Sequence, residues 1–302
     1  MKNNLFNGIR LVTEKKALNN DLKAIQSRAN ELNKKANINA VGQIQIPLYE
    51  LRGVISDSGA TKINGYEITP SANIITRARM MEGLTANAKY PIFRTNCSRW
   101  ENEQGQDQTT DSVTLLPHRL FSEISYSSTL IRSTDETLQN ALTQDLLNDI
   151  YAKVESTLLS DKDETNGNPK GLFNILSATT ADTLTINVFA NAEKDFFASG
   201  AKQPIYIFSP SVFAKTKETF KELFKNGRFN DIEYVVTANM EDNYILLADL
   251  NYLLIGCFGA LDVSVDDVTE KVSGKTRLLI NSFWDWNVTN DGAFQAIKLQ
   301  NE

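Results

Sequence analysis

The chain contains a single histidine, His118, and this residue limits the acid–base chemistry open to the protein. Histidine is the only side chain that ordinarily titrates near neutral pH, so any histidine-based catalytic or metal site would depend on it. It lies in a strand-like run, 115–119, and no GxSxG, HExxH or P-loop pattern surrounds it. An isolated histidine in such a segment is typical of a structural position, so we predict no catalytic role.

Paired carboxylates and thiols are the next candidates, because both can bind metal ions. Asp161–Asp163 lacks the glycine and the final glutamate of an EF-hand loop, and Asp266–Asp267 is more typical of an acidic surface loop. Cys97 and Cys257 lie far apart and match no CxxC spacing, which indicates free thiols in a reducing compartment. The sequence therefore predicts no catalytic, cofactor-binding or metal-binding residues and no enzyme.

Trp284 and Trp286 could stack on nucleic-acid bases, since aromatic side chains two residues apart lie on one face of a strand. The strand that carries them, about 276–288, also places Leu278 and Ile280 on that face. A large apolar face of this kind is more often part of a hydrophobic core. We therefore expect the two tryptophans to be buried.

Composition agrees with an ordinary globular chain of 302 residues, with 41% apolar content and a net charge of −6. No run approaches the roughly 20 apolar residues that a membrane span requires. The first 16 residues lack the apolar core of a signal peptide, so we expect neither a membrane protein nor an exported one.

Residues 1–36 are predicted to be helical, with an apolar series that runs from Leu11 to Leu32. They hold eight basic and three acidic residues, a net charge of +5, which leaves −11 for the rest of the chain. Such a segment could meet an acidic surface or nucleic acid, although a solvated helix face is the more common outcome. Residues 37–70 are interrupted by glycine and proline and predict an extended arm without a hydrophobic core. Such an arm would pack on another subunit or across the body of its own subunit.

Two strand-like stretches, 92–96 and 112–126, flank the polar run 98–111 and predict a long hairpin with a polar tip. On a monomer this hairpin would expose edges that another chain should cover. The next element is a long helix over about 134–159, with Ser133 and Glu136 as a capping box and an apolar residue at every fourth position from Leu138 to Leu158. At 1.5 Å per residue it would run about 39 Å, the length of a structural spine.

The remaining sequence predicts a second unit at about 181–270, in which strands alternate with a helix that begins near Ser209. The last strand-like stretches, 276–288 and 293–299, are separated by a turn sequence at 290–292 and predict a C-terminal hairpin.

Taken in order, these segments resemble the major capsid protein family of tailed bacteriophages, which has the Hong Kong-ninety-seven-type capsid fold. The resemblance covers roughly residues 40–302. It depends on the order of four segments: FSEISYS at 121–127, GNPKGLF at 167–173, TRLLIN at 276–281 and NDGAFQAI at 290–297.

The resemblance implies an α+β fold with an N-terminal arm at 37–70, a peripheral domain at 71–180 and 271–302, and an axial domain at 181–270. The peripheral domain would include an extended loop at about 94–119 and the spine helix at about 134–159. Residues 1–36 would be an N-terminal helix that could serve as a short scaffold-like segment.

Carried over from the family, the function would be self-assembly through pentamers and hexamers into an icosahedral shell around double-stranded DNA. Portal, scaffolding or protease proteins and the packaged DNA would be its partners, with no cofactor and no membrane. Assembly would occur in the bacterial host cytoplasm, and the virion capsid would be the final location.

Two alternatives stay open from the sequence. An encapsulin-like nanocompartment shell protein would share the fold and would enclose a cargo enzyme instead of DNA. A cytosolic α+β enzyme would have the same composition, but it would form a monomer or dimer with an apolar pocket and convergent polar groups.

Overall fold

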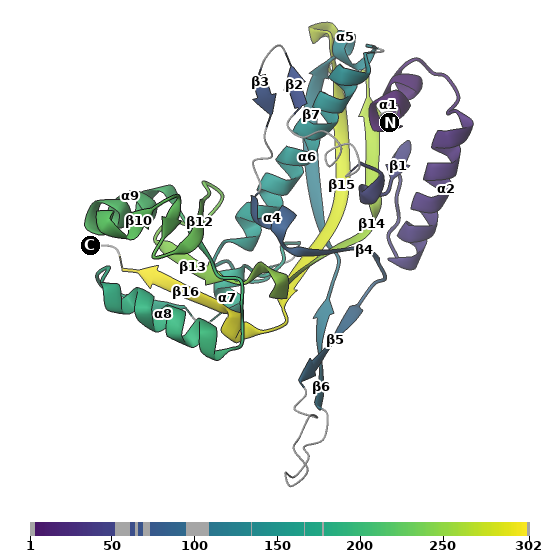
Figure 1. The fold of residues 1–302 in the computed structure, drawn as a ribbon. Coiled ribbons are helices and arrows are strands. Elements are labelled where there is room, and N and C mark those ends of the chain that lie inside the picture. The colour runs from purple at the N-terminus through teal and green to yellow at the C-terminus, as the bar shows by residue number, and fades with distance from the viewer. Residues whose placement is uncertain are drawn as a thin grey trace.

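The computed structural model describes residues 4–51, 61–63, 66–68, 73–94, 109–133, 135–165, 167–176 and 178–300. Two mixed β-sheets, each covered by helices, form the body, and a two-stranded hairpin projects from it (Figure 1). The described helices are α1 (Asn4–Thr13), α2 (Asn20–Lys35), α4 (Asn73–Arg77), α5 (Ser128–Ile131), α6 (Glu136–Leu158), α7 (Leu172–Ile175), α8 (Ile186–Ala198) and α9 (Pro210–Thr219).

The strands, in chain order, are β1 (Ile44–Ile46), β2 (Thr61–Ile63), β3 (Tyr66–Ile68), β4 (Arg79–Leu84), β5 (Ala88–Arg94), β6 (Thr109–Leu115), β7 (His118–Ser127), β8 (Thr179–Ala181), β9 (Ile205–Phe208), β10 (Phe224–Lys225), β11 (Arg228–Phe229), β12 (Ile232–Val236), β13 (Tyr244–Ala248), β14 (Leu253–Asp266), β15 (Lys275–Val288) and β16 (Phe294–Leu299).

The first sheet is built around two 14-residue strands, β14 and β15, which pair antiparallel. The strand order is β1-β14-β15-β7, and β4 runs parallel to β14 beside β1. Alternate residues of β15 are buried, as expected for a strand with one face on the core. Trp284 and Trp286 are only 2% and 3% exposed, so the prediction that they belong to the core is confirmed.

Helix α6 covers the buried face of this sheet, where Leu146 and Ile150 are fully enclosed. Tyr151 meets the ring of Trp284 edge-on, with the ring centroids 6.1 Å apart. The predicted spine helix is therefore confirmed, but its first turn differs from the predicted capping box. The side chain of Asp135, and not that of Ser133, accepts the free N–H group of the first turn, that of Thr137.

The second sheet has seven strands in the order β10-β11-β12-β9-β13-β16-β8. Helices α8 and α9 pack against it through an aromatic cluster in which Phe189 meets Tyr206 and Phe213 meets Phe208. The apolar strand β13 is fully buried in the interior of the sheet, where it pairs with β9 and β16.

The division of the chain between the two sheets corrects two predictions. β15 lies in the first sheet and β16 in the second, so 276–288 and 293–299 do not form a hairpin. The short 3-10 turn at Asp291–Ala293 redirects the chain, and the N–H of Asp249 donates to the carbonyl of Ala293. Strand β14 belongs to the first sheet, although it falls within the predicted unit 181–270.

The N-terminal segment also differs from its prediction. Leu5, Phe6 and Ile9 of α1 are fully buried in the main core, so α1 is an integral part of the fold and not a solvated helix. A turn around Lys15, with φ at +55°, separates α1 from α2, where the sequence pattern predicted one helix. The first part of the predicted arm, up to Leu51, packs in cis as well, because β1 pairs with β14 and is buried.

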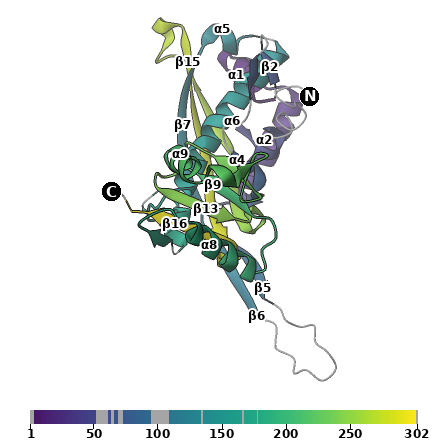
Figure 2. The same ribbon diagram turned by 60° about the vertical axis from the view of Figure 1, so that its left-hand side comes forward.

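β5 and β6 form the projecting hairpin, with Ala88 opposite Leu115 and Arg94 opposite Thr109 (Figures 1 and 2). The hairpin prediction is thus confirmed, and its tip, 95–108, with Cys97, lies outside the described residues. The predicted second strand, 112–126, is two strands, since β6 pairs with β5 and β7 pairs with β15, and the break falls at Leu116 and Pro117. Proline cannot donate to a strand ladder, which favours a break there.

Candidate functional site

The root of the β5–β6 hairpin is held to the first sheet by a half-buried carboxylate, Asp285. One carboxylate oxygen accepts the backbone N–H of Leu116 at 2.7 Å, and the other accepts the N–H of Trp286 at 2.8 Å. Burial raises the pKa of Asp285, an effect that these two hydrogen bonds oppose. Sequence reasoning missed this residue, because an aspartate between two tryptophans carries no pattern that predicts its partner.

His118 lies beside this root, at the start of β7. Its Nε2 atom is 3.8 Å from a carboxylate oxygen of Glu164, and its side chain is 14% exposed. The neighbouring Arg119 donates two hydrogen bonds to Asn281 and packs over the ring of Phe121. These contacts fasten β7 to β15 and to the loop after α6, which is a structural use of the single histidine.

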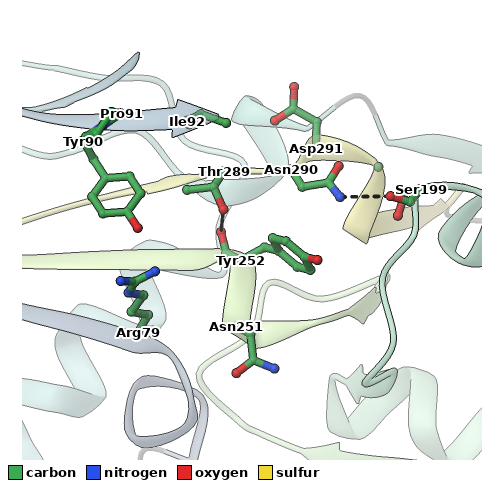
Figure 3. A pocket seen from close by; sticks show the side chains of 11 residues that line it. Arg79, Tyr90, Pro91, Ile92, Ser199, Asn251, Tyr252, Thr289, Asn290 and Asp291 are labelled. Carbon is green, nitrogen blue, oxygen red and sulfur yellow. Dashed lines mark hydrogen bonds between the residues drawn. The ribbon is translucent and has the colours of Figure 1, made fainter. Parts of the chain in front are cut away.

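A cavity of about 620 Å³ opens between the hairpin and the second sheet (Figure 3). Arg79 of β4 lies over the ring of Tyr90 on the hairpin side, with its guanidinium carbon 5.2 Å from the ring centroid. On the opposite side, the side chain of Asn290 donates to the carbonyl of Ser199 at 3.2 Å. The walls come from β4, from β5 of the hairpin and from connecting segments at Ser199, 251–252 and 289–292, so the cavity is a crevice between the hairpin and the loops that link the two sheets.

The far end of the β14–β15 pair forms a second projecting surface, a tip at residues 267–274. The carboxylate of Asp266 accepts the hydroxyl of Thr269 and the N–H groups of Thr269 and Val268, and it pairs with Arg277. These bonds hold the pKa of Asp266 well below its usual range. The tip is therefore ordered, and it carries Val268, 74% exposed, and Val272, fully exposed. Two apolar side chains on an ordered tip suit a contact with another molecule.

The two sheets are joined by the loop after α6. Asp161 accepts hydrogen bonds from Tyr244 of β13 and Lys298 of β16, and Trp286 of β15 donates to the carbonyl of Lys170 at 2.7 Å. Gly171 is required here, because a Cβ atom at this position would collide with the carbonyl oxygen of Ser160. The segment GNPKGLF at 167–173 thus belongs to the joint between the sheets.

A buried glutamate on α6, Glu155, reinforces this joint. Its carboxylate accepts the hydroxyl of Thr237 at 2.7 Å and the N–H of Ile74 at 3.1 Å. Burial raises the pKa of Glu155, while the hydrogen bonds oppose that shift. Because Thr237 follows β12 and Ile74 belongs to α4, one side chain connects the long helix to the second sheet and to the segment that leads into the hairpin.

The other candidate residues from the sequence, an aspartate and a cysteine, have an ion-pair partner or are buried. Asp163 lies 3.9 Å from Lys170, and Cys257 is buried. Among the described residues, no group of three or more His, Cys, Asp or Glu side chains is placed to hold a metal ion. Within the same ranges, no helix is long and apolar enough to span a membrane.

The fold and its surfaces define a structural protein with a body of two joined sheets and extensions that project from it. The family model described as "Phage capsid family" matches residues 60–299, and the chain belongs to that family. The resemblance to tailed-phage major capsid proteins, with the Hong Kong-ninety-seven-type α+β fold, is confirmed. The chain is therefore a bacteriophage capsid protein with a location in the virion capsid.

Solved structures support the same fold. The Mycobacterium phage Adephagia structure has 13% identity and a TM-score of 0.56, over 83% of this chain and 98% of that chain. The capsid of a native GTA particle has 12% identity and a TM-score of 0.53, over 81% and 95%. Phage G, whose structure is described as major capsid and decoration proteins, has 10% identity and a TM-score of 0.53, over 80% and 95%. No curated protein matches the sequence.

Proposed function

We propose that this chain is the major capsid protein of a tailed phage or prophage and that it assembles through pentamers and hexamers into an icosahedral shell enclosing double-stranded DNA. The observation that carries the proposal is the β5–β6 hairpin, a two-stranded ladder that projects from the body. A two-stranded hairpin is marginally stable by itself. Contacts with a neighbouring subunit would cover its edges and supply the missing stabilisation.

The two sheets suggest a division of roles within the shell. We assign the peripheral domain to the first sheet with α6, and the axial domain near the five- and six-fold axes to the second sheet with α8 and α9. The hairpin would then lie over a neighbouring subunit. The crevice lined by Arg79 and Tyr90 would receive part of another copy.

Further partners follow from the same proposal. Portal, scaffolding or protease proteins would take part in assembly in the bacterial host cytoplasm, and the packaged DNA would be contacted without sequence specificity. The family points to a structural role and not to an enzyme.

Purified protein tested by sedimentation and negative-stain electron microscopy would decide the question. We expect capsomers or closed shells. Closed shells that form in cells should contain DNA. As a matched variant, residues 95–108 are replaced by Asn-Gly, a dipeptide suited to a two-residue hairpin turn. This variant should keep the thermal unfolding of the monomer and lose closed shells. A wild-type chain that stays monomeric at all concentrations would contradict the proposal, and particles filled with protein cargo would favour a nanocompartment shell.

A further inference from the structure

The exposed side of α2, together with the turn before it, carries more basic than acidic side chains. From residue 14 to residue 35 the chain has six basic and three acidic side chains, whereas the rest of the protein outside residues 1–36 has a net charge of −11. The six basic residues, all exposed, are Lys15, Lys16, Lys23, Arg28, Lys34 and Lys35. Two of them have acidic partners: Lys16 pairs with Glu14, and Arg28 with Glu50.

The other four lysines have no ion-pair partner within the described part of the chain. Another lysine-rich segment offers a contrast, because residues 215–233, around α9, have five basic and four acidic side chains. A balanced surface is typical of a solvated face, whereas an unbalanced one attracts a partner of opposite charge. The α2 surface therefore fits a polyanion.

The fold holds this basic surface rigidly. Leu22, Ile25 and Ala29, on the opposite side of α2, are buried against the body. At the end of α2, the side chain of Asn33 accepts the N–H of Ala260 at 2.7 Å. The lysines thus project from a helix that is fixed at several points to the first sheet.

Helix α2 lies at the margin of the first sheet. It leads into Ala36, which packs in a small cluster with Phe258 of β14. Figure 1 shows α2 beyond β1 and β14, at the outer margin of the molecule. Its exposed lysines are therefore open to a partner outside the subunit.

Resting on the proposed function, we infer that the α2 surface contacts the phosphate backbone of the packaged double-stranded DNA and that this surface points into the particle. From Lys23 to Lys35 the helix spans about 18 Å. Duplex DNA has one negative charge per about 1.7 Å, so about ten phosphates lie along that length. Lysine side chains are flexible point charges, which suits contact with phosphates without sequence readout.

The test compares two triple variants of the full chain in binding to a short random-sequence DNA duplex at several salt concentrations. Lys23→Gln, Lys34→Gln and Lys35→Gln remove charge from α2, and Lys215→Gln, Lys221→Gln and Lys225→Gln remove the same charge from exposed positions around α9. The slope of log Kobs against log salt should become shallower by up to about 2.7 in the first variant, about 0.9 for each lost phosphate contact. It should change little in the second.

Equal slopes in the two variants would overturn the inference. Binding of a polyglutamate peptide that depends on the three α2 lysines, with DNA binding unchanged, would also overturn it and would identify an acidic protein as the partner. Both variants should still form particles, because the altered side chains are exposed. Failure of the wild-type chain to form particles contradicts the proposed function alone, since DNA binding is measured on subunits.

A second measurement uses only the wild-type protein. Intact particles are treated with an amine-reactive reagent too bulky to enter, and labelled lysines are identified by mass spectrometry. We expect Lys23, Lys34 and Lys35 to be unlabelled in intact particles and labelled after disruption. Labelling of these lysines in intact particles would place the α2 surface outside and overturn the inference.

Discussion

Two antiparallel strand pairs in this molecule have similar hydrogen-bonding patterns and opposite surroundings. The β14–β15 pair has β1, β4 and β7 beside it and α6 across one face. The β5–β6 pair forms a separate two-stranded sheet and projects from the body. The comparison teaches that strand pairing alone does not show where a segment gains its stability. The first pair is stabilised within the subunit, and under our proposal the second is stabilised by neighbours.

The largest effect on folding should come from a charge placed beneath β14–β15. Ile150→Asp puts an unpaired carboxylate into the fully buried face of α6, and we expect a loss of about 4 kcal/mol in the free energy of unfolding. Urea denaturation of the unassembled subunit would measure it. Thr137→Asp, at an exposed position in the first turn of the same helix, is the control and should change stability by less than about 0.5 kcal/mol. Equal losses of stability in the two variants would mean that Ile150 does not lie in the core as described.

A slightly smaller loss is expected at the N-terminus. Phe6→Ala removes a fully buried ring that meets Tyr126 edge-on, with centroids 5.8 Å apart. We expect a cost of about 3 kcal/mol, from the transfer of the ring and from the cavity left behind. Ala24→Ser, at an exposed position of α2, serves as the control. If the thermal unfolding of Phe6→Ala were unchanged, α1 would be a solvated helix and not part of the core.

The joint between the sheets should show a pH dependence of defined sign. Because the pKa of Glu155 is raised in the folded protein, its favourable contribution is complete below the unfolded value and is lost as pH rises through the folded value. Unfolding free energy should therefore fall with rising pH in this window, by at most about 1.4 kcal/mol per pH unit. In Glu155→Gln this component should disappear. Parallel pH–stability curves for the two proteins would refute the assignment.

The smallest effect on folding is expected in the hairpin. Ser112→Pro removes an N–H group from β6 at an exposed position, and the free energy of unfolding of the subunit should change by less than about 1 kcal/mol. Particle yield should nevertheless fall strongly, and Ser112→Ala should assemble normally. Cooperative loss of subunit stability in Ser112→Pro would show that the hairpin belongs to the core and would erase the contrast with β14–β15.

The sequence predicted those elements whose signal is local. The leucine spacing of α6 and the polar run within the hairpin are examples, because period and composition are written in consecutive residues. The sheet that receives a strand is not a local property. β16 is apolar enough for either sheet, and its place was decided by pairing with β13, about 50 residues earlier in the chain.

The polar residues that connect the hairpin and the two sheets were harder to predict for the same reason. Asp285 and Glu155 acquire their roles from Leu116 and Thr237, partners distant in sequence, so neither belongs to a short motif. For α1, the sequence contains the apolar positions Leu5, Phe6 and Ile9, but the net charge of +5 over residues 1–36 favoured a solvated helix. Burial depends on what the rest of the chain places opposite a helix.

The contact between Asn33 and Ala260 has a consequence for the order in which the chain can fold. The two residues are 227 positions apart, and among the strands that the structure describes β1 pairs with β14 alone. During synthesis, the apolar side of α2 must therefore wait until most of the polypeptide has left the ribosome. Long-range pairing of this kind slows folding and leaves apolar surface open to aggregation in the meantime. Newly made subunits should consequently depend on chaperones until β14 emerges and closes over the N-terminal helices.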